Sequence, residues 1–138
     1  MKIFFQTFCF ILLSSVVATD SYAKSYRVHG QVYLKEGQDK STRRIPPLDV
    51  VSGVPIIMKG LFGKIISLVF VIEPPPSDKY LLTVSLLTTP KSANDFNVTI
   101  LTHTFQSTLV GQQNGPFEFE KEQNGIKIGG VVAISPKR

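Results

Sequence analysis

The sequence is poor in cysteine, tryptophan and histidine, residues on which many enzymes and metal proteins depend. It has one cysteine, no tryptophan and two histidines in 138 residues. The single cysteine, Cys9, excludes an internal disulfide framework and a cysteine-based zinc site. Charged residues make up 18% of the chain and hydrophobic residues 43%. This balance excludes a disordered chain, which needs low hydrophobicity and high charge.

The motifs of nucleophilic, nucleotide-dependent and metal-dependent enzymes are missing as well. No G-x-S-x-G, G-x-G-x-x-G or Walker pattern occurs. His29 and His103 lie far apart, with no H-E-x-x-H spacing, and both are predicted to face solvent on strands. We therefore predict that the protein is not an enzyme and has no catalytic residue, cofactor or metal site.

Three glutamates form the one acidic pattern that needs an explanation. Glu118, Glu120 and Glu122 alternate along one predicted strand, so their side chains lie on the same face, about 7 Å apart. Paired carboxylates can hydrolyse glycosides, but such sites usually need a deep cleft with aromatic platforms, and no tryptophan is present. An exposed stripe that protects an edge strand from aggregation is the favoured interpretation.

The N-terminus has the pattern of a secretory signal peptide. Lys2 precedes an apolar stretch, and the small residues Ser21 and Ala23 follow at the spacing that signal peptidase requires. We predict a signal peptide over residues 1–23, with a cut after Ala18 as a second possibility. The competing interpretation, a membrane anchor, is disfavoured because polar residues interrupt a stretch that is short for a bilayer. The protein is therefore expected to be exported, to the periplasm or the extracellular space.

Residues 24–138 are predicted to form one domain without cysteine. Its net charge stays +5, because Lys2 and Asp20 leave together. The most apolar later run, Ile65–Ile72, is short and bounded by Lys64 and Glu73, which suits a strand buried on both faces. We therefore expect no membrane span after cleavage.

The hydrophobic pattern of this domain has a period of two and no helical stretch. The predicted strands cover residues 26–34, 50–58, 64–73, 80–88, 96–105, 117–123 and 126–134. Turn signals recur every 8–15 residues, as is typical of all-β folds. The sequence predicts an antiparallel β-sandwich or a small, partly open barrel of about seven strands.

The last two strands carry the most specific local prediction. Asn124-Gly125 tolerates the positive φ angles that a two-residue type I′ turn requires. A turn there places Glu122 opposite Lys127, Phe119 opposite Gly130 and Phe117 opposite Val132. Residues 125–136 also match residues 63–74 at five of twelve positions. This similarity suggests two similar β-units packed face to face.

The basic residues are concentrated in one segment. Residues 35–49 are rich in charge and contain Pro46-Pro47, so this segment is predicted to be a loop or a long hairpin connection. Its basic side chains are the candidate partner-binding residues: Lys35, Lys40, Arg43 and Arg44. The partner would be another protein or an anionic component of the cell envelope, and export argues against nucleic acid.

Two functions follow from these patterns. The first is an exported, non-enzymatic protein-binding or structural module of the cell envelope or secreted space. It could recruit its partner by strand addition at an edge, for which Val50–Met58 is the candidate because Pro55 excludes it from a sheet centre. The alternative is a small secreted inhibitor, immunity or effector protein that acts through the basic 35–49 loop.

Overall fold

The computed structural model describes residues 25–111 and 114–137, and within them the chain forms strands and no helix. The predicted signal peptide, residues 1–23, lies outside the described residues. The strands are β1 (Ser25–Glu36), β2 (Asp39–Val51), β3 (Ile56–Leu61), β4 (Lys64–Ile72), β5 (Lys79–Thr88), β6 (Thr99–Thr108), β7 (Phe117–Gln123) and β8 (Ile126–Pro136). No helix of the described residues is long and apolar enough to cross a membrane.

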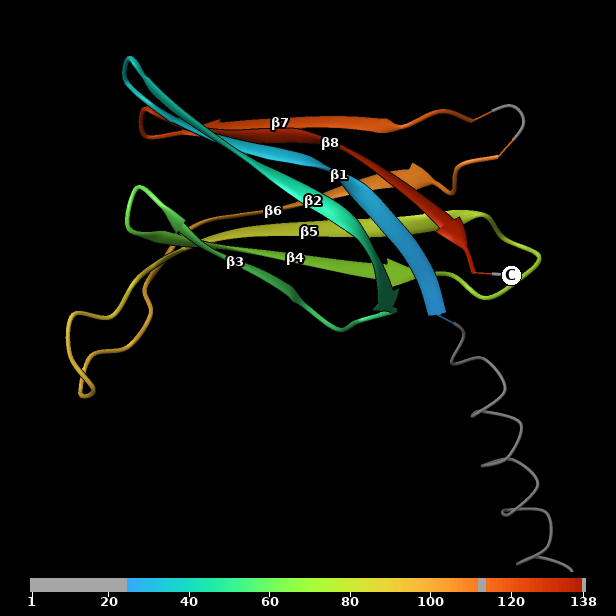
Figure 1. Cartoon of the computed structure of the whole chain (residues 1–138), viewed down its shortest axis with the longest axis horizontal. Coiled ribbons are helices and arrows are strands. Elements are labelled where there is room, and N and C mark those ends of the chain that lie inside the picture. Colours follow the sequence, from blue (N-terminus) through green and yellow to red (C-terminus); the bar gives the residue numbers. More distant parts are fainter. Residues whose placement is uncertain (1–24, 112–113, 138) are drawn as a thin grey trace, which may run out of the picture.

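The strands form two antiparallel sheets of four. The first sheet has the order β2-β1-β8-β7 and the second the order β3-β4-β5-β6. The sheets lie as two layers (Figure 1), with β3 in contact with β2 along one side and β6 in contact with β7 along the other. The predicted all-β antiparallel class is confirmed, with one strand more in the described chain than the seven predicted.

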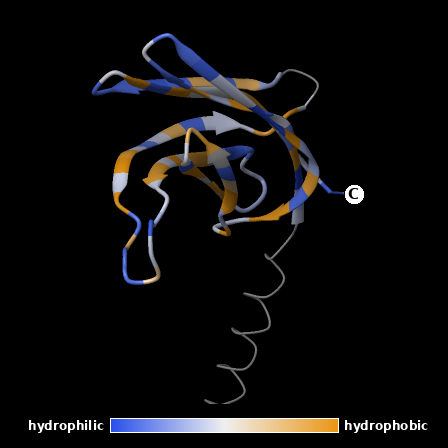
Figure 2. Ribbon diagram, turned by 60° about the vertical axis from the view of Figure 1, so that its left-hand side comes forward, coloured by the Kyte–Doolittle hydropathy of each residue, from blue (hydrophilic) through white to orange (hydrophobic). Residues whose placement is uncertain are grey.

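The core lies between the two layers. Alternate residues of each strand point inward, so that Val28, Val32 and Leu34 of the first sheet pack with Leu68 and Phe70 of the second. The same alternation is visible in Figure 2, where orange and blue segments succeed each other along the strands. Each fully buried aliphatic or aromatic side chain contributes about 1.5–3 kcal/mol.

Residues 39–51 form β2, so the prediction that residues 35–49 form a loop was wrong. Gly37 has a φ of 58° in the turn that joins β1 and β2. β2 is an edge strand, so its many charged side chains can remain in solvent, while Ile45 and Val50 are buried. Pro46 and Pro47 are accommodated where the register of β2 against β1 shifts, between Val28 and Gly30. An edge strand tolerates proline because one side of it needs no ladder hydrogen bonds.

The Val50–Met58 strand was predicted in part. Its first residues end β2, and Ser52 and Gly53 make the connection to β3, which begins at Ile56. β3 is one of the two outer strands of the second sheet, and Pro55, from which the edge position was predicted, lies directly before it. The prediction that β4 is buried on both faces was wrong: Ile66, Leu68 and Phe70 point into the core, whereas Val71 on the outer face is 47% exposed.

A bulge in β6 changes which face His103 occupies. Leu86 pairs with Leu101 but Leu87 pairs with Thr99, so Ile100 is an extra residue. The face alternation therefore shifts by one, and His103 lies on the core side, opposite the buried Val84. The prediction that His103 faces solvent was wrong for this reason. Its ring is half-buried, 4.6 Å from that of Phe105.

The β7–β8 hairpin has the register predicted from Asn124-Gly125. Glu122 pairs with Lys127, Phe119 with Gly130 and Phe117 with Val132. Asn124 and Gly125 have φ angles of 54° and 78°, as the turn requires. Phe119 also lies over the bare backbone of Gly130, where an added Cβ would be 3.1 Å from its ring.

The two halves of the chain occupy equivalent positions in the topology. If strands β1–β4 are exchanged with β5–β8, each with the strand four places away, the order of the first sheet becomes β6-β5-β4-β3, which is that of the second sheet read in reverse. The hairpins β3–β4 and β7–β8 correspond under this exchange, and both turn at a positive-φ residue followed by glycine, Phe62-Gly63 and Asn124-Gly125. Each half contributes two strands to each sheet, so the corresponding hairpins β3–β4 and β7–β8, and not the whole halves, lie in the two opposed sheets.

Candidate functional site

The outer face of the first sheet carries opposite charges at its two edges. We call it the polarised face and define it by the solvent-side residues Lys40, Thr42 and Arg44 of β2, Gln31, Tyr33 and Lys35 of β1, Lys127, Gly129 and Val131 of β8, and Glu118, Glu120 and Glu122 of β7. The basic side chains lie toward β2 and the carboxylates lie on β7. The edges are three strand spacings apart, or about 14 Å.

The structure brings together three of the four predicted partner-binding residues. Lys35, Lys40 and Arg44 lie on the polarised face, and all three are exposed. Arg43 is also exposed, but it pairs with the buried Val32 and therefore projects from the opposite face of β2. Within residues 25–111 and 114–137, none of these four side chains makes an ion pair.

Three lysines stand in one row across the sheet. Lys35 pairs with Lys40 on β2 and with Lys127 on β8, which places like charges directly opposite each other. Such an arrangement is destabilising unless an anion lies nearby. Lys127 has Glu120 at 3.4 Å and Glu122 at 3.9 Å, while Lys40 lies over the ring of Tyr33, 4.5 Å from its centroid. The row therefore remains positive at its β2 end.

The glutamates lie on an edge strand, as predicted, and the structure places that strand at the edge opposite β2. Glu118, Glu120 and Glu122 are exposed on the outer face of β7, the last strand of its sheet. The predicted Glu122–Lys127 cross-strand pair is present. Glu118 makes no ion pair with any residue that the structure describes. β7 thus presents an edge with uncompensated negative charge.

Tyr33 connects the two charged edges. Its hydroxyl donates a hydrogen bond to a carboxylate oxygen of Glu120, passing over Gly129 of the intervening strand β8. Burial, followed by this hydrogen bond and the negative charges of Glu120 and Glu118, raises the pKa of Tyr33 to about 12. The same hydrogen bond, with Lys127 nearby, holds the pKa of Glu120 below its usual value.

Sequence reasoning missed Tyr33 and Lys127 as members of this surface. The β7–β8 register already placed Glu120 opposite Gly129. The missing step was the pairing of β1 with β8, which brings together residues about a hundred positions apart and has no local signal. The pair of glycines at 129 and 130 was the one available hint, because bare backbone in a strand often marks a close approach.

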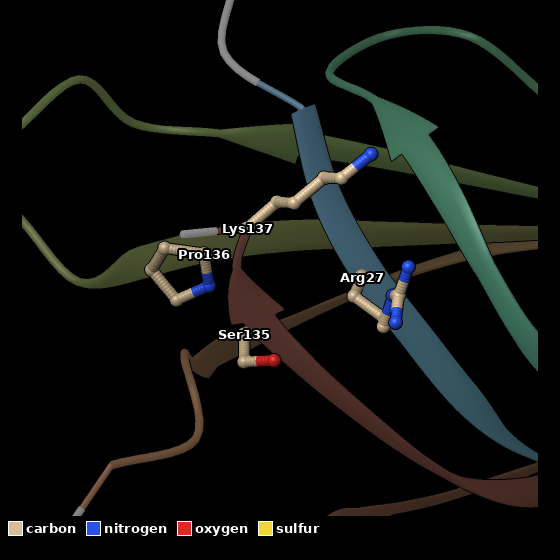
Figure 3. Close-up of a pocket in the computed structure, with 4 residues that line it drawn as sticks. All are labelled: Arg27, Ser135, Pro136 and Lys137. Atoms are coloured by element: carbon tan, nitrogen blue, oxygen red, sulfur yellow. The ribbon is translucent and has the colours of Figure 1, made fainter.

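A second charged cluster lies where β1, β2 and the C-terminus meet. Asp49 accepts from Arg27 at 3.3 Å and from Lys137 at 2.5 Å. The hydrogen bond from Lys137 comes first among the causes that lower the pKa of Asp49. Beside it is a shallow pocket of about 210 Å³ lined by Arg27, Ser135, Pro136 and Lys137, with both cationic side chains extending to the same side (Figure 3). Asp49 partly neutralises these cations.

The histidines do not come together. His29 lies on β1 of the first sheet and His103 on β6 of the second. No group of three or more histidine, cysteine, aspartate or glutamate residues is arranged to hold a metal ion in the described part of the chain. The polarised face offers opposed charges, hydrogen-bonding side chains and two sheet edges.

The described chain is thus an all-β protein of two antiparallel sheets with a charged, two-edged surface. A comparison with known protein families, with curated proteins and with solved structures finds no match.

Proposed function

We propose that this protein is an exported, non-enzymatic β-sandwich that acts as a protein-binding or structural module of the cell envelope or secreted space. The observation that carries the proposal is the basic β2 edge. Lys35, Lys40 and Arg44 gather there without ion-pair partners among the described residues, next to the open backbone of an edge strand. A partner that adds a strand to β2 and carries carboxylates would satisfy both features.

Export is the first half of this proposal, and it is supported by the residue pattern of positions 1–23. Expression in a secreting host and mass spectrometry of the released protein tests it. We expect a mature N-terminus at Lys24, or at Thr19 for the earlier cut. A chain that retains Met1 in the membrane fraction contradicts it.

Partner binding is the second half. The full chain is tagged at its C-terminus and used for capture from its own envelope or medium fraction, in parallel with Arg44→Glu and Lys91→Glu. Both variants reverse one exposed charge, but Lys91 lies in the β5–β6 connection, away from β2. A partner retained by wild type and Lys91→Glu and lost by Arg44→Glu supports the proposal. Equal capture by all three chains contradicts it.

The alternative is a secreted inhibitor, immunity or effector protein that uses the 35–49 segment. The β1–β2 hairpin favours it, because its tip projects beyond the body of the first sheet in Figure 1. Such a protein would form a complex of fixed stoichiometry with one enzyme and inhibit it. An effect of Gln38→Ala at the hairpin tip as large as that of Arg44→Glu distinguishes this function from edge-strand binding.

A further inference from the structure

We propose that the partner of the β2 edge is the β7 edge of a second copy of this chain, so that copies join head to tail into a continuous first sheet. This inference rests on the proposed function and names its partner. Its basis is the match between the two edges of one sheet in length, direction, register and charge.

The two edges agree in length and direction. β7 has 7 residues, and the part of β2 before its prolines, residues 39–45, is equally long. All neighbours in the first sheet are antiparallel, so β2 and β7, three steps apart, also run in opposite directions. A second copy shifted sideways across the strands, and rotated to follow the twist of the sheet, therefore continues the antiparallel order without being turned over.

When β7 of a second copy is placed beside β2 in this way, the register of the sheet brings opposite charges together. Lys40 stands in the same cross-strand row as Glu122, and Arg44 stands in the same row as Glu118. A sideways neighbour placed in this register sets Lys40 of one copy beside Glu122 of the next. It also sets Arg44 beside Glu118, and these two side chains have no ion-pair partner in the described chain. On the core side, Ile45 comes beside Phe117.

The charges also exclude the competing edge pairings. Two β2 edges would bring Lys40 and Arg44 against the same cations, and two β7 edges would bring three glutamates against three glutamates. Like charges directly opposite each other destabilise a sheet. Charged edges usually prevent all strand addition, but here they prevent only pairing between like edges. A head-to-tail contact uses different surfaces on the two copies and does not close into a dimer.

The second sheet is compatible with the same shift. β3 lies beside β2 and β6 beside β7, so a sideways neighbour brings its β6 toward β3. Neither strand contains a carboxylate, and Lys59 is the one side chain with a full charge on the two strands. No like-charge contact therefore opposes the joining of the first sheet.

The test is a charge exchange at a single row. Sedimentation velocity is measured on the full chain in the form that the expressing cells release, over a range of concentrations and salt. Wild type is expected to form species beyond the dimer, more weakly as salt rises. Arg44→Glu and Glu118→Lys should each weaken self-association about tenfold, because one attractive pair becomes a repulsive one. Lys91→Glu should behave as wild type.

The double variant that carries both exchanges distinguishes charge pairing from damage to either strand. Arg44→Glu with Glu118→Lys restores an opposite-charge row and should regain self-association, while circular dichroism verifies that each chain is folded. Wild type that is monomeric at all concentrations, or association that ignores Arg44 and Glu118, overturns the inference. A monomer that still captures a different envelope protein in an Arg44-dependent manner overturns this inference alone. If the protein neither self-associates nor captures a partner, the proposed function is overturned as well.

Discussion

The hydroxyl of Tyr33 on β1 donates a hydrogen bond to the carboxylate of Glu120 on β7, across the full width of β8. The contact is possible because residue 129, directly between them, is glycine. It joins the basic and acidic halves of the polarised face and fixes the aromatic ring on which Lys40 lies.

The titration of Tyr33 should depend on Glu120. Burial and then the hydrogen bond to Glu120 raise the pKa of Tyr33 to about 12 from an ordinary 10.0, so the stabilisation by neutral Tyr33 is complete below pH 10 and is lost as pH rises through about 12. Glu120→Gln removes the negative acceptor and should move the pKa of Tyr33 back toward 10.0. The ultraviolet absorbance of tyrosinate measures this shift, and Tyr33→Phe identifies the step. Glu122→Gln is the control, and an equal shift there would contradict the assignment.

Gly129 should not tolerate a side chain. A Cβ at residue 129 would lie 2.6 Å from the Tyr33 hydroxyl and 2.8 Å from the carbonyl oxygen of Phe119, which is backbone and cannot move easily. We expect Gly129→Ala to lower the free energy of unfolding by about 1–3 kcal/mol, measured by urea denaturation. Gly115→Ala, with open space around its Cβ, should change stability little. Equal effects of the two substitutions would show that the close approach over Gly129 is absent.

Two phenylalanines provide a matched test of the core. Phe70 is fully buried with its ring 5.9 Å from that of Tyr80, whereas Phe96 is 88% exposed. Phe70→Ala should cost about 3–5 kcal/mol because it leaves a cavity between the sheets. Phe96→Ala should leave the unfolding midpoint nearly unchanged. If Phe96→Ala destabilises the isolated chain as strongly, the β5–β6 connection must pack differently from the structure described above.

Asp49 should hold the C-terminus against β1 in a pH-dependent manner. The pKa of Asp49 is lowered by Lys137 and Arg27, so the interaction is complete above the ordinary value of 3.8 and is lost as pH falls through the lower folded value. Hydrogen exchange at the amide of Lys137, which donates to the carbonyl of Ser25, should accelerate in Asp49→Asn at neutral pH. An unchanged exchange rate at the Lys137 amide in Asp49→Asn would contradict the role of Asp49. Asp78→Asn is the control, because it leaves the contact between Asp49 and Lys137 intact.

The predictions that held depend on neighbouring residues. The period-two alternation located β1 and β5, because a strand with one buried face imposes that pattern on its own residues. The short apolar run Ile65–Ile72 located β4, and the Asn124-Gly125 signal located β7 and β8. The Asn124-Gly125 turn determined the register of β7 and β8, because a two-residue turn leaves no freedom in which residues face each other.

The predictions that failed depend on distant contacts. Residues 35–49 were predicted as a loop because charge and proline obscure the few buried positions, and only pairing with β1 makes residues 39–49 part of a strand. His103 was assigned to the wrong face because the extra residue Ile100 reverses the alternation, and the sequence does not mark that bulge.

The sequence by itself therefore determined the all-β class, the final hairpin and the acidic stripe of β7. Tertiary structure decided that β2 and β7 are the two edges of one sheet. It also decided that Arg43 projects from the face opposite to Lys40 and Arg44, and that the Tyr33 hydroxyl donates a hydrogen bond to Glu120. The physical reason is that strand order depends on contacts between segments up to a hundred residues apart, which are chosen by the packing of the whole core rather than by local preference.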